Sequence, residues 1–159
     1  MDDTLARLAA VEDIKRLKYR YLRTLDLKRW DEFAETLAPD ATADYGSHAG
    51  GTPLRFAGRD AIVGYLSGAL GPDITTVHVC HHPEITVDGD TAQATWCLED
   101  TVLATPFRTL IRGAAYYTDT YRRDAAAWRI SHTSYTRLYE ATIPYTDLPN
   151  LHLTTPEGS

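Results

Sequence analysis

A change of hydrophobic period near Ile74 constrains the fold more than any other feature of the sequence. Before it, apolar residues recur every three or four positions, which is the period of an amphipathic helix. After it come four long segments rich in β-branched and aromatic residues, which are typical of strands. Helices followed by a meander of antiparallel strands predict an α+β domain, in which the helices pack on one face of a curved sheet.

Three helices are expected before the change of period. The first has its apolar positions between Leu5 and Leu25, the second is RWDEFAETL and ends at Pro39, and the third is RDAIVGYLSGAL. The stretch ATADYGSHAGGTPLRF, between the second helix and the third, predicts a short strand followed by a mobile loop. His48 lies in that loop, where we expect it to be solvated.

The four strand-like segments are ITTVHVCHHPEITV, TAQATWCLEDTVLA, RTLIRGAAYYTDTYRR and WRISHTSYTRLYE. Asp88-Gly89-Asp90 joins the first two and is a strong hairpin signal, while RDAAA forms the turn between the last two. Long strands usually bend, so we expect bulges or bends near Pro83 and Gly113. A bent sheet wrapped on helices forms a cone, and a pocket is expected in the mouth of that cone.

The chain length of 159 residues suits one domain, which we assign to residues 1–140. The tail, residues 141–159, contains three prolines and no clear period, so it either caps the pocket or lacks order. The N-terminus is acidic and has no long apolar stretch, and no apolar run approaches the roughly 18 residues that span a bilayer. We therefore expect a cytoplasmic protein without a membrane partner.

Charge and motif content argue against several other classes. A formal net charge of -6 without a basic stripe argues against a nucleic-acid partner. Neither a Gly-rich phosphate loop nor a GxSxG elbow occurs, and Cys80 and Cys97 have no metal or redox spacing. His78 and His82 have the HxxxH spacing, but on a strand they would lie about 13 Å apart, which is too far for one metal. We expect neither a metal nor a cofactor.

Asp26 is the first candidate for chemistry, because it places a carboxylate at the rim of the apolar stripe of the first helix. It could simply end that helix, or it could be half-buried and aimed into the cone, where it would need a partner. His78 is that candidate partner, since strand alternation puts it on one face with Thr76 and Cys80. An Asp hydrogen-bonded to one ring nitrogen of His78 would leave the other nitrogen as a base.

The ten tyrosines of the chain favour a pocket for an apolar, ring-containing ligand that carries a few oxygens. Tyr21 lies five residues before Asp26 and can border the same cavity. His132, on the last strand, is a further candidate for the pocket. The other expected wall residues are Tyr45, Tyr117 and Tyr135.

Several stretches together resemble the SnoaL-like family of the nuclear transport factor 2-like superfamily. They are WDEFAETLAPDATADY, the helix start GRDAI, the hairpin HHPEITVDGDTAQA and the final YTDTYRRDAAAWRISH, in the family's order over about residues 4–140. The resemblance implies a cone-shaped α+β barrel, with about three N-terminal helices on a strongly curved, mostly antiparallel sheet. It also implies an oligomer, with a trimer favoured over a dimer.

The branch that contains scytalone dehydratase, bile acid dehydratase and lindane dehydrochlorinase has a catalytic Asp and His. By motif position, the resemblance implies that Asp26 and His78 have these roles and that Tyr21 binds a substrate oxygen or assists the leaving group. Some relatives carry a catalytic Arg in the last strand, where this chain reads WRISHTSY, so His132 and Thr133 occupy that region. This departure weakens the case for halide or carboxylate elimination. Which of the two residues faces the pocket stays open.

The function expected from the resemblance is that of a cofactor-independent lyase or isomerase of the dehydratase type. It would abstract a proton next to a carbonyl of a small hydrophobic substrate of steroid, terpenoid or polyketide type. Two alternatives remain open: a polyketide-type cyclase that uses the same base, and a noncatalytic ligand-binding or subunit module.

Overall fold

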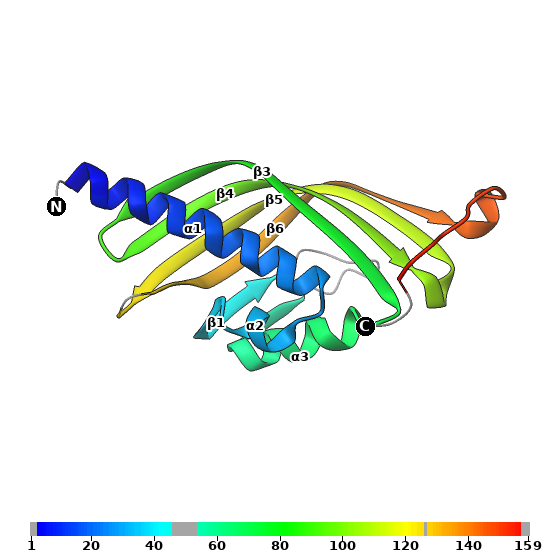
Figure 1. Cartoon of the computed structure of the whole chain (residues 1–159), viewed down its shortest axis with the longest axis horizontal. Coiled ribbons are helices and arrows are strands. Elements are labelled where there is room, and N and C mark those ends of the chain that lie inside the picture. The colour runs from blue at the N-terminus through cyan, green and yellow to red at the C-terminus, as the bar shows by residue number, and fades with distance from the viewer. Residues whose placement is uncertain (1–2, 46–53, 126, 157–159) are drawn as a thin grey trace.

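The computed structural model describes residues 3–45, 54–125 and 127–156 (Figure 1). In this part of the chain, α1 (Asp3–Asp26) is long, α2 (Trp30–Ala34) is short and α3 (Arg59–Ala69) follows after two strands. Figure 1 shows α1 running along one face of the sheet, with α2 and α3 grouped below its C-terminal half. No helix among the described residues is long and apolar enough to cross a membrane.

Six strands form one mixed sheet that does not close on itself, in the order β2-β1-β6-β5-β4-β3. All neighbours pair antiparallel except β1 and β6, which are parallel. The predicted fold, helices on a curved and mostly antiparallel sheet, is therefore confirmed. The strands are β1 (Leu37–Asp44), β2 (Arg55–Ala57), β3 (Ile74–Asp88), β4 (Thr91–Ala104), β5 (Thr109–Asp124) and β6 (Ala127–Pro144).

The region around Pro39 differs from the sequence prediction. The second helix ends at Ala34, and Pro39 lies inside β1 instead of terminating the helix. The register of β1 against β6 shifts between Leu37 and Thr42, so Pro39, which lacks an N–H group, lies where the ladder is already interrupted. The short strand β2 was not predicted. The predicted mobile loop with His48 lies in residues 46–53, outside the described residues.

The predicted hairpin and bends are present. Gly89 has a φ of 57° in the turn between β3 and β4, a conformation that glycine adopts without strain. The register of β3 shifts between His81 and Glu84, around Pro83, and that of β5 against β6 shifts between Ala114 and Ala115, next to Gly113. Such bulges increase the local twist, and the long strands curve around the helices in Figure 1.

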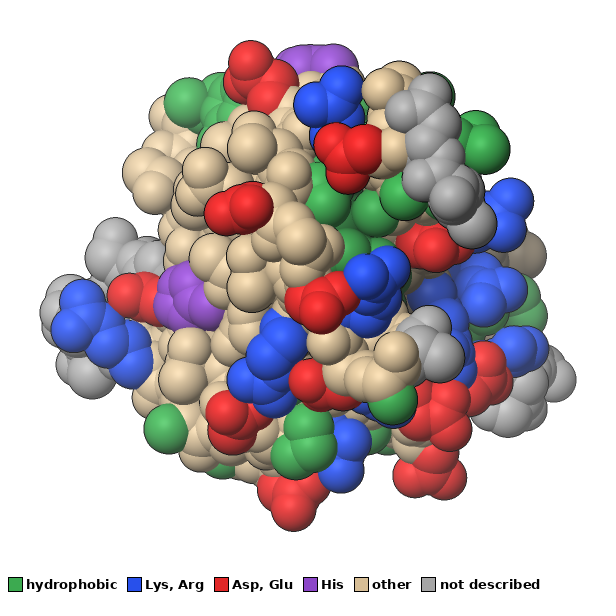
Figure 2. Space-filling view, turned by 90° about the vertical axis from the view of Figure 1, so that its left-hand side faces the viewer, with side chains coloured by type: hydrophobic (Ala, Val, Ile, Leu, Met, Phe, Trp, Pro, Cys, Tyr) green, Lys and Arg blue, Asp and Glu red, His purple; other side chains and the backbone are tan. Residues whose placement is uncertain are grey.

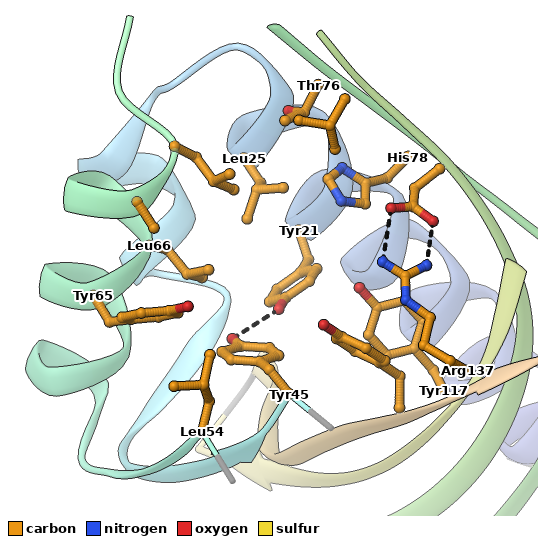
Figure 3. Close-up of a pocket in the computed structure, with 15 residues that line it drawn as sticks. Tyr21, Leu25, Tyr45, Leu54, Tyr65, Leu66, Thr76, His78, Tyr117 and Arg137 are labelled. Atoms are coloured by element: carbon orange, nitrogen blue, oxygen red, sulfur yellow. Dashed lines mark hydrogen bonds and ion pairs between the residues drawn. The ribbon is translucent and has the colours of Figure 1, made fainter. Parts of the chain in front are cut away.

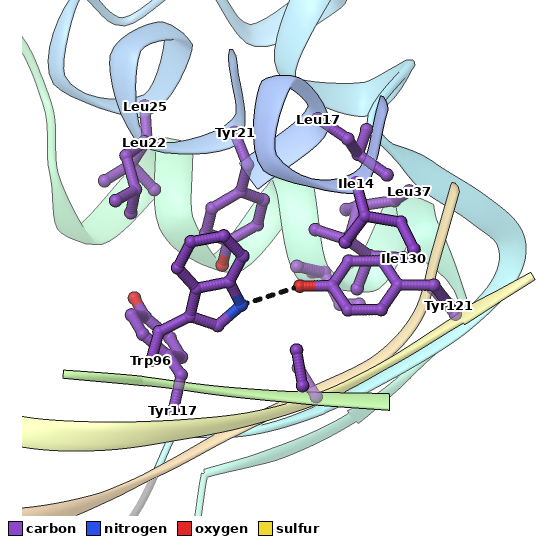
Figure 4. Packing of buried hydrophobic residues seen from close by; sticks show 14 of the residues in the cluster. Ile14, Leu17, Tyr21, Leu22, Leu25, Leu37, Trp96, Tyr117, Tyr121 and Ile130 are labelled. Carbon is purple, nitrogen blue, oxygen red and sulfur yellow. Dashed lines mark hydrogen bonds between the residues drawn. The ribbon is translucent and has the colours of Figure 1, made fainter. Parts of the chain in front are cut away.

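The core lies between α1 and the concave face of the sheet (Figure 4). Leu17, Tyr21 and Leu25 of α1 are buried against strand residues such as Trp96 and Ile130. Burying side chains of this size contributes roughly 1.5–3 kcal/mol each before the entropy cost of ordering them. The first turns of α1 do not share this burial.

The N-terminal end of α1 lies at one extremity of the molecule, where Leu5 and Leu8 are 58% and 57% exposed (Figure 1). Their apolar spacing continues the helix, but the core does not extend to them. Figure 2 shows the face at this extremity, where acidic and basic side chains are intermixed. Surface ion pairs also connect strands, as Arg122 of β5 does with Asp40 of β1. Mixed charges on this face give it no single-sign patch.

Candidate active site

Asp26, the last residue of α1, contacts His78 of β3 at two points. Its Oδ1 lies 2.7 Å from the ring Nδ1 of His78, and its Oδ2 accepts a hydrogen bond of 2.9 Å from the backbone N–H of His78. The Asp26 and His78 side chains are only 19% and 13% exposed. A carboxylate that accepts the Nδ1 hydrogen leaves Nε2 of the imidazole with a free lone pair. The pair can therefore accept a proton at Nε2.

Thr76 and Lys28 support Asp26 from the other side. Thr76 Oγ1 donates to Asp26 Oδ1 over 2.8 Å, and Lys28 Nζ donates to Thr76 Oγ1 over 3.2 Å. Burial lowers the pKa of Lys28, and the negative charge of Asp26 opposes that shift. Lys28 adopts a left-handed φ of 59°, which ends α1 and turns the chain toward α2. Sequence reasoning did not identify Lys28, because its role depends on this turn.

A cavity of about 170 Å³ lies between α1, α3 and the sheet, and His78 is in its wall (Figure 3). Its lining combines aliphatic side chains with polar groups of the sheet. His78 also borders an outer hollow with Asp26 and Leu27, so the pair lies between the cavity and the surface. Five tyrosines line the cavity: Tyr21, Tyr45, Tyr65, Tyr117 and Tyr135.

The tyrosine hydroxyls make the cavity a neutral, hydrogen-bonding environment. The hydroxyls of Tyr21 and Tyr45 lie 3.1 Å apart, and the rings of Tyr117 and Tyr135 meet edge to face. Burial raises the pKa of Tyr21, Tyr45 and Tyr117 well above the usual value for tyrosine. These phenols therefore stay protonated near neutral pH and can donate hydrogen bonds to a ligand oxygen.

Asp100 of β4 and Arg137 of β6 add an ion pair to the cavity wall. Arg137 donates from both Nη atoms to the two carboxylate oxygens of Asp100, one contact measuring 3.0 Å (Figure 3). The positions directly after WRIS are His132 and Thr133, but Arg137 farther along the same strand still brings an arginine to the cavity. Arg137 lies four residues beyond the WRISHT stretch and still reaches the cavity, because bulges set which side chains of β6 face inward.

A bulge in β6 also decides where His132 and Thr133 lie. Tyr121 pairs with Ile130 and Thr120 pairs with His132, so Ser131 is the extra residue and the alternation reverses after it. His132 Nδ1 and Thr42 Oγ1 form a hydrogen bond of 2.7 Å, and His132 borders a separate hollow beside β1 and β2. Thr133 is fully buried, and its hydroxyl has no hydrogen-bond partner among the described residues. Neither residue lines the tyrosine cavity.

The C-terminal tail begins as a continuation of the sheet. Residues 141–144 complete β6 and pair with β5, and a short 3-10 turn follows at Tyr145–Asp147. Beyond it, the tail borders a hollow with Arg108. The described tail residues are not among those that line the tyrosine cavity. A capping role for the tail stays a prediction.

Gly113 of β5 makes room for the Arg137–Asp100 pair. A Cβ atom at this position would lie 2.5 Å from Arg137 Nη1 and 3.0 Å from Asp100 Oδ1. The atom in closest contact is the end of a flexible side chain, so we expect Gly113→Ala to displace Arg137 while the sheet still forms. Ligand affinity or turnover should fall about tenfold, with a loss of unfolding free energy of about 1 kcal/mol. Urea unfolding and steady-state kinetics would measure both.

Gly64→Ala in α3 is the matched control for Gly113→Ala. A Cβ atom at Gly64 meets nothing within 4 Å, and alanine favours a helix over glycine by roughly 1 kcal/mol. This variant should keep full activity and gain slightly in stability. Equal losses in both variants would show that the space beside Arg137 is not what Gly113 provides.

No group of three or more His, Cys, Asp or Glu residues in the described ranges is arranged to hold a metal ion. The polar groups that line the cavity are His78, which Asp26 supports from outside, Thr76, the phenols and the Asp100–Arg137 pair. Such a site can remove a proton from carbon and stabilise a negative oxygen by hydrogen bonds.

Three known proteins illustrate what the chain is similar to. An uncharacterized protein of Mycobacterium tuberculosis, Rv2910c, is 27% identical over 144 residues, covering 88% of this chain and 95% of the relative. A hexachlorocyclohexane dehydrochlorinase, LinA-type3 from Novosphingobium barchaimii, superposes with a TM-score of 0.78 at 18% identity, covering 97% of this chain and all of that one (100%). A scytalone dehydratase-like protein from Novosphingobium aromaticivorans gives a TM-score of 0.77 at 20% identity, with coverages of 87% and 90%.

At these identities the two solved structures establish the shared fold and nothing about the reaction. The sequence itself carries the family assignment, since the model of the SnoaL-like domain matches residues 6–134. That match includes α1 from residue 6 onward, the whole of β3 to β5 and the start of β6, and hence Asp26, His78 and Asp100. The chain therefore belongs to the SnoaL-like domain family of the nuclear transport factor 2-like superfamily.

Proposed function

We propose that the protein is a cofactor-independent lyase or isomerase of the dehydratase type. The observation that carries this proposal is the contact between Asp26 and His78, 2.7 Å long, in the wall of a cavity lined with tyrosines. Nε2 of His78 takes a proton from a carbon next to a substrate carbonyl. Asp26 fixes the ring and stabilises the imidazolium that forms, and Tyr21 donates a hydrogen bond to the carbonyl oxygen.

The electron pair of the broken C–H bond moves into the carbonyl and forms an enolate. In a dehydration, the enolate then expels a β-hydroxyl group, which leaves as water after it receives a proton from the imidazolium. General acid–base catalysis of this kind contributes roughly 10²–10⁴-fold, and the phenol donors stabilise the enolate. Arg137, held by Asp100, lies where it can bind a second substrate oxygen.

The size and charge of the cavity support a neutral ring as the bound group. A cavity near 150 Å³ accommodates roughly one benzene ring, so about 170 Å³ receives one six-membered ring of a larger steroid-, terpenoid- or polyketide-like ketone. The positive charge of Arg137 is balanced by the negative charge of Asp100. A ligand that carries a net charge of its own is therefore disfavoured. The rest of a larger substrate would extend through the mouth.

Halide elimination is a second candidate, which the position of Arg137 favours. A guanidinium in the cavity wall can stabilise a departing chloride in the same way as a departing oxygen. The dehydrochlorinase of similar fold is named for hexachlorocyclohexane, a six-membered ring whose chlorine atoms make it bulkier than benzene, so part of it would extend beyond a cavity of about 170 Å³. Chloride release from hexachlorocyclohexane would test this activity directly.

A screen of cyclic β-hydroxy ketones tests the leading proposal. Incubation in D₂O followed by mass spectrometry should show a product lighter by one water, and recovered substrate should carry deuterium at the carbon next to the carbonyl wherever the enolate has been reprotonated. A product of unchanged mass with a new ring would identify the cyclase alternative. Ligand binding with no deuterium exchange, no loss of water and no ring closure across the screen would count against proton abstraction and favour a noncatalytic module.

A further inference from the structure

Lys18 is a charged residue buried in the core, behind the cavity. Its side chain on α1 is fully buried, and its Nζ donates to Asp119 Oδ2 of β5 over 2.7 Å. Tyr121 donates to the same oxygen over 2.9 Å, and Trp96 donates to the Tyr121 hydroxyl over 3.0 Å (Figure 4). These residues form a continuous polar network from β4 to α1, inside an otherwise apolar core.

The ammonium group of Lys18 also contacts two rings of the candidate active site. Nζ lies 3.4 Å from the ring centroid of Tyr117 and 4.7 Å from that of Tyr21. Both tyrosines also line the cavity. Each ring therefore lies between the Lys18 ammonium group and the space that a ligand would occupy. Burial lowers the pKa of Lys18, and the charge and hydrogen bond of Asp119 oppose that shift.

Fold stability gives a weak reason for this arrangement. The desolvation cost of a buried ion pair is offset only when its remaining lone pairs accept hydrogen bonds. A protein with apolar residues of similar volume in place of the pair is often as stable. Here Asp119 Oδ1 has no hydrogen-bond partner in the described part of the chain. A leucine or methionine at position 18 would fill the same core volume at lower cost. The charge therefore points to a function beyond packing.

We propose that Lys18 is a positioning residue, whose ammonium group fixes the Tyr21 and Tyr117 rings and makes their O–H groups stronger hydrogen-bond donors to a substrate oxygen. The part of this proposal that concerns a substrate oxygen rests on the proposed function. A cation on a ring face is attracted by the negative π-system and withdraws electron density from the ring. An O–H group on such a ring stabilises negative charge better, and the benefit is greatest when the enolate forms.

Asp119 opposes the field of Lys18, so the test removes both charges together. Lys18→Met with Asp119→Asn keeps the side-chain volumes and leaves no unpaired buried charge. Lys18→Leu with Asp119→Leu is a second neutral pair, in case the first folds poorly. Tyr121→Phe is the control, because it perturbs the same network while Lys18 and Asp119 keep their charges.

The first readout is the ¹³C NMR signal of tyrosine Cζ at neutral pH, which reports the electron density of each ring and needs no substrate. Labelled tyrosine would be incorporated, and Tyr21→Phe and Tyr117→Phe would assign the two signals. We expect both signals to shift in the neutral pair and to stay in place in Tyr121→Phe, with Tyr65 unmoved in either. Unmoved signals in both neutral pairs, or equal shifts in the Tyr121→Phe control, would overturn the proposal.

The second readout is turnover of a substrate from the screen. The neutral pair should lower kcat about tenfold and change KM by less than about threefold, since the donors act mainly on the charged transition state. Shifted NMR signals with unchanged kcat would overturn the role in substrate stabilisation. If no substrate is turned over, the proposed function fails while the NMR experiment still decides whether Lys18 polarises the two tyrosines.

Discussion

Asp26→Asn and His78→Ala are each expected to lower kcat by about 10³–10⁴-fold. Without the imidazole, the cavity wall loses the group that is proposed to take the substrate proton. In Asp26→Asn the amide group can donate to Nδ1, which places the ring hydrogen on Nε2 and removes the lone pair that would accept the substrate proton. Asparagine keeps the shape of the carboxylate, so the hydrogen bond from the His78 backbone can persist. Steady-state kinetics with a substrate from the screen would measure the loss.

The control for these variants lies on the same strand. His81→Ala removes an imidazole whose side chain is 44% exposed and paired with Glu99 at the surface, so activity should stay within about twofold of the original protein. Circular dichroism and urea unfolding would show that all three variants keep the fold. Turnover close to the original value in either Asp26→Asn or His78→Ala would remove the pair from the mechanism.

The protein is expected to lose stability steeply above pH 10. Burial raises the pKa of four tyrosines well above its usual value near 10, so they keep their protons in the folded state and lose them in the unfolded state. Stability is thus fully present below about pH 10 and falls at higher pH by about 1.4 kcal/mol per pH unit for each group, or about 5.6 kcal/mol per pH unit for the four together. The four are Tyr21, Tyr45, Tyr117 and Tyr121.

Lys18 contributes with the opposite sign, because its pKa is lowered in the folded state. Its contribution fades between about pH 10.5 and 11.5, as lysine loses its proton in the unfolded state as well. Urea unfolding at several pH values between about 11 and 12 therefore reports mainly on the groups whose pKa burial raises, which are the tyrosines and Cys80. Tyr121→Phe should reduce the slope by about one proton, whereas Tyr19→Phe, at a 51% exposed position, should leave it unchanged. A flat profile in the original protein would contradict the burial of these phenols.

The order of helices and strands was predictable because long, strongly periodic segments decide their own secondary structure. The secondary structure around Pro39 was predicted incorrectly. A proline normally ends a helix, whereas here it lies in a strand whose ladder is interrupted. The face of His78 was also predictable, since Thr76, His78 and Cys80 precede the bulge of β3 and keep simple alternation. Downstream of a bulge that alternation fails.

Arg137, Asp100 and Lys18 illustrate what no local pattern contained. Arg137 reaches the cavity and His132 does not, because one extra residue in β6 reverses which side chains point inward. Lys18 is spaced like a core residue, yet only the packing of α1 on β5 shows that its charge meets Asp119 and two tyrosine rings. Gly113 likewise matters only through the ion pair that lies above it.

The sequence by itself determined the α+β plan, the family, and Asp26, His78 and Tyr21 as candidates, because periodicity and short motifs depend on neighbours along the chain. The tertiary structure alone decided which polar groups share one cavity. Register shifts and helix docking depend on packing between residues far apart in sequence, such as the 52 positions that separate Asp26 from His78 and the 101 that separate Lys18 from Asp119. A change of one residue in strand register exchanges the two faces of a sheet, and no local pattern records that choice.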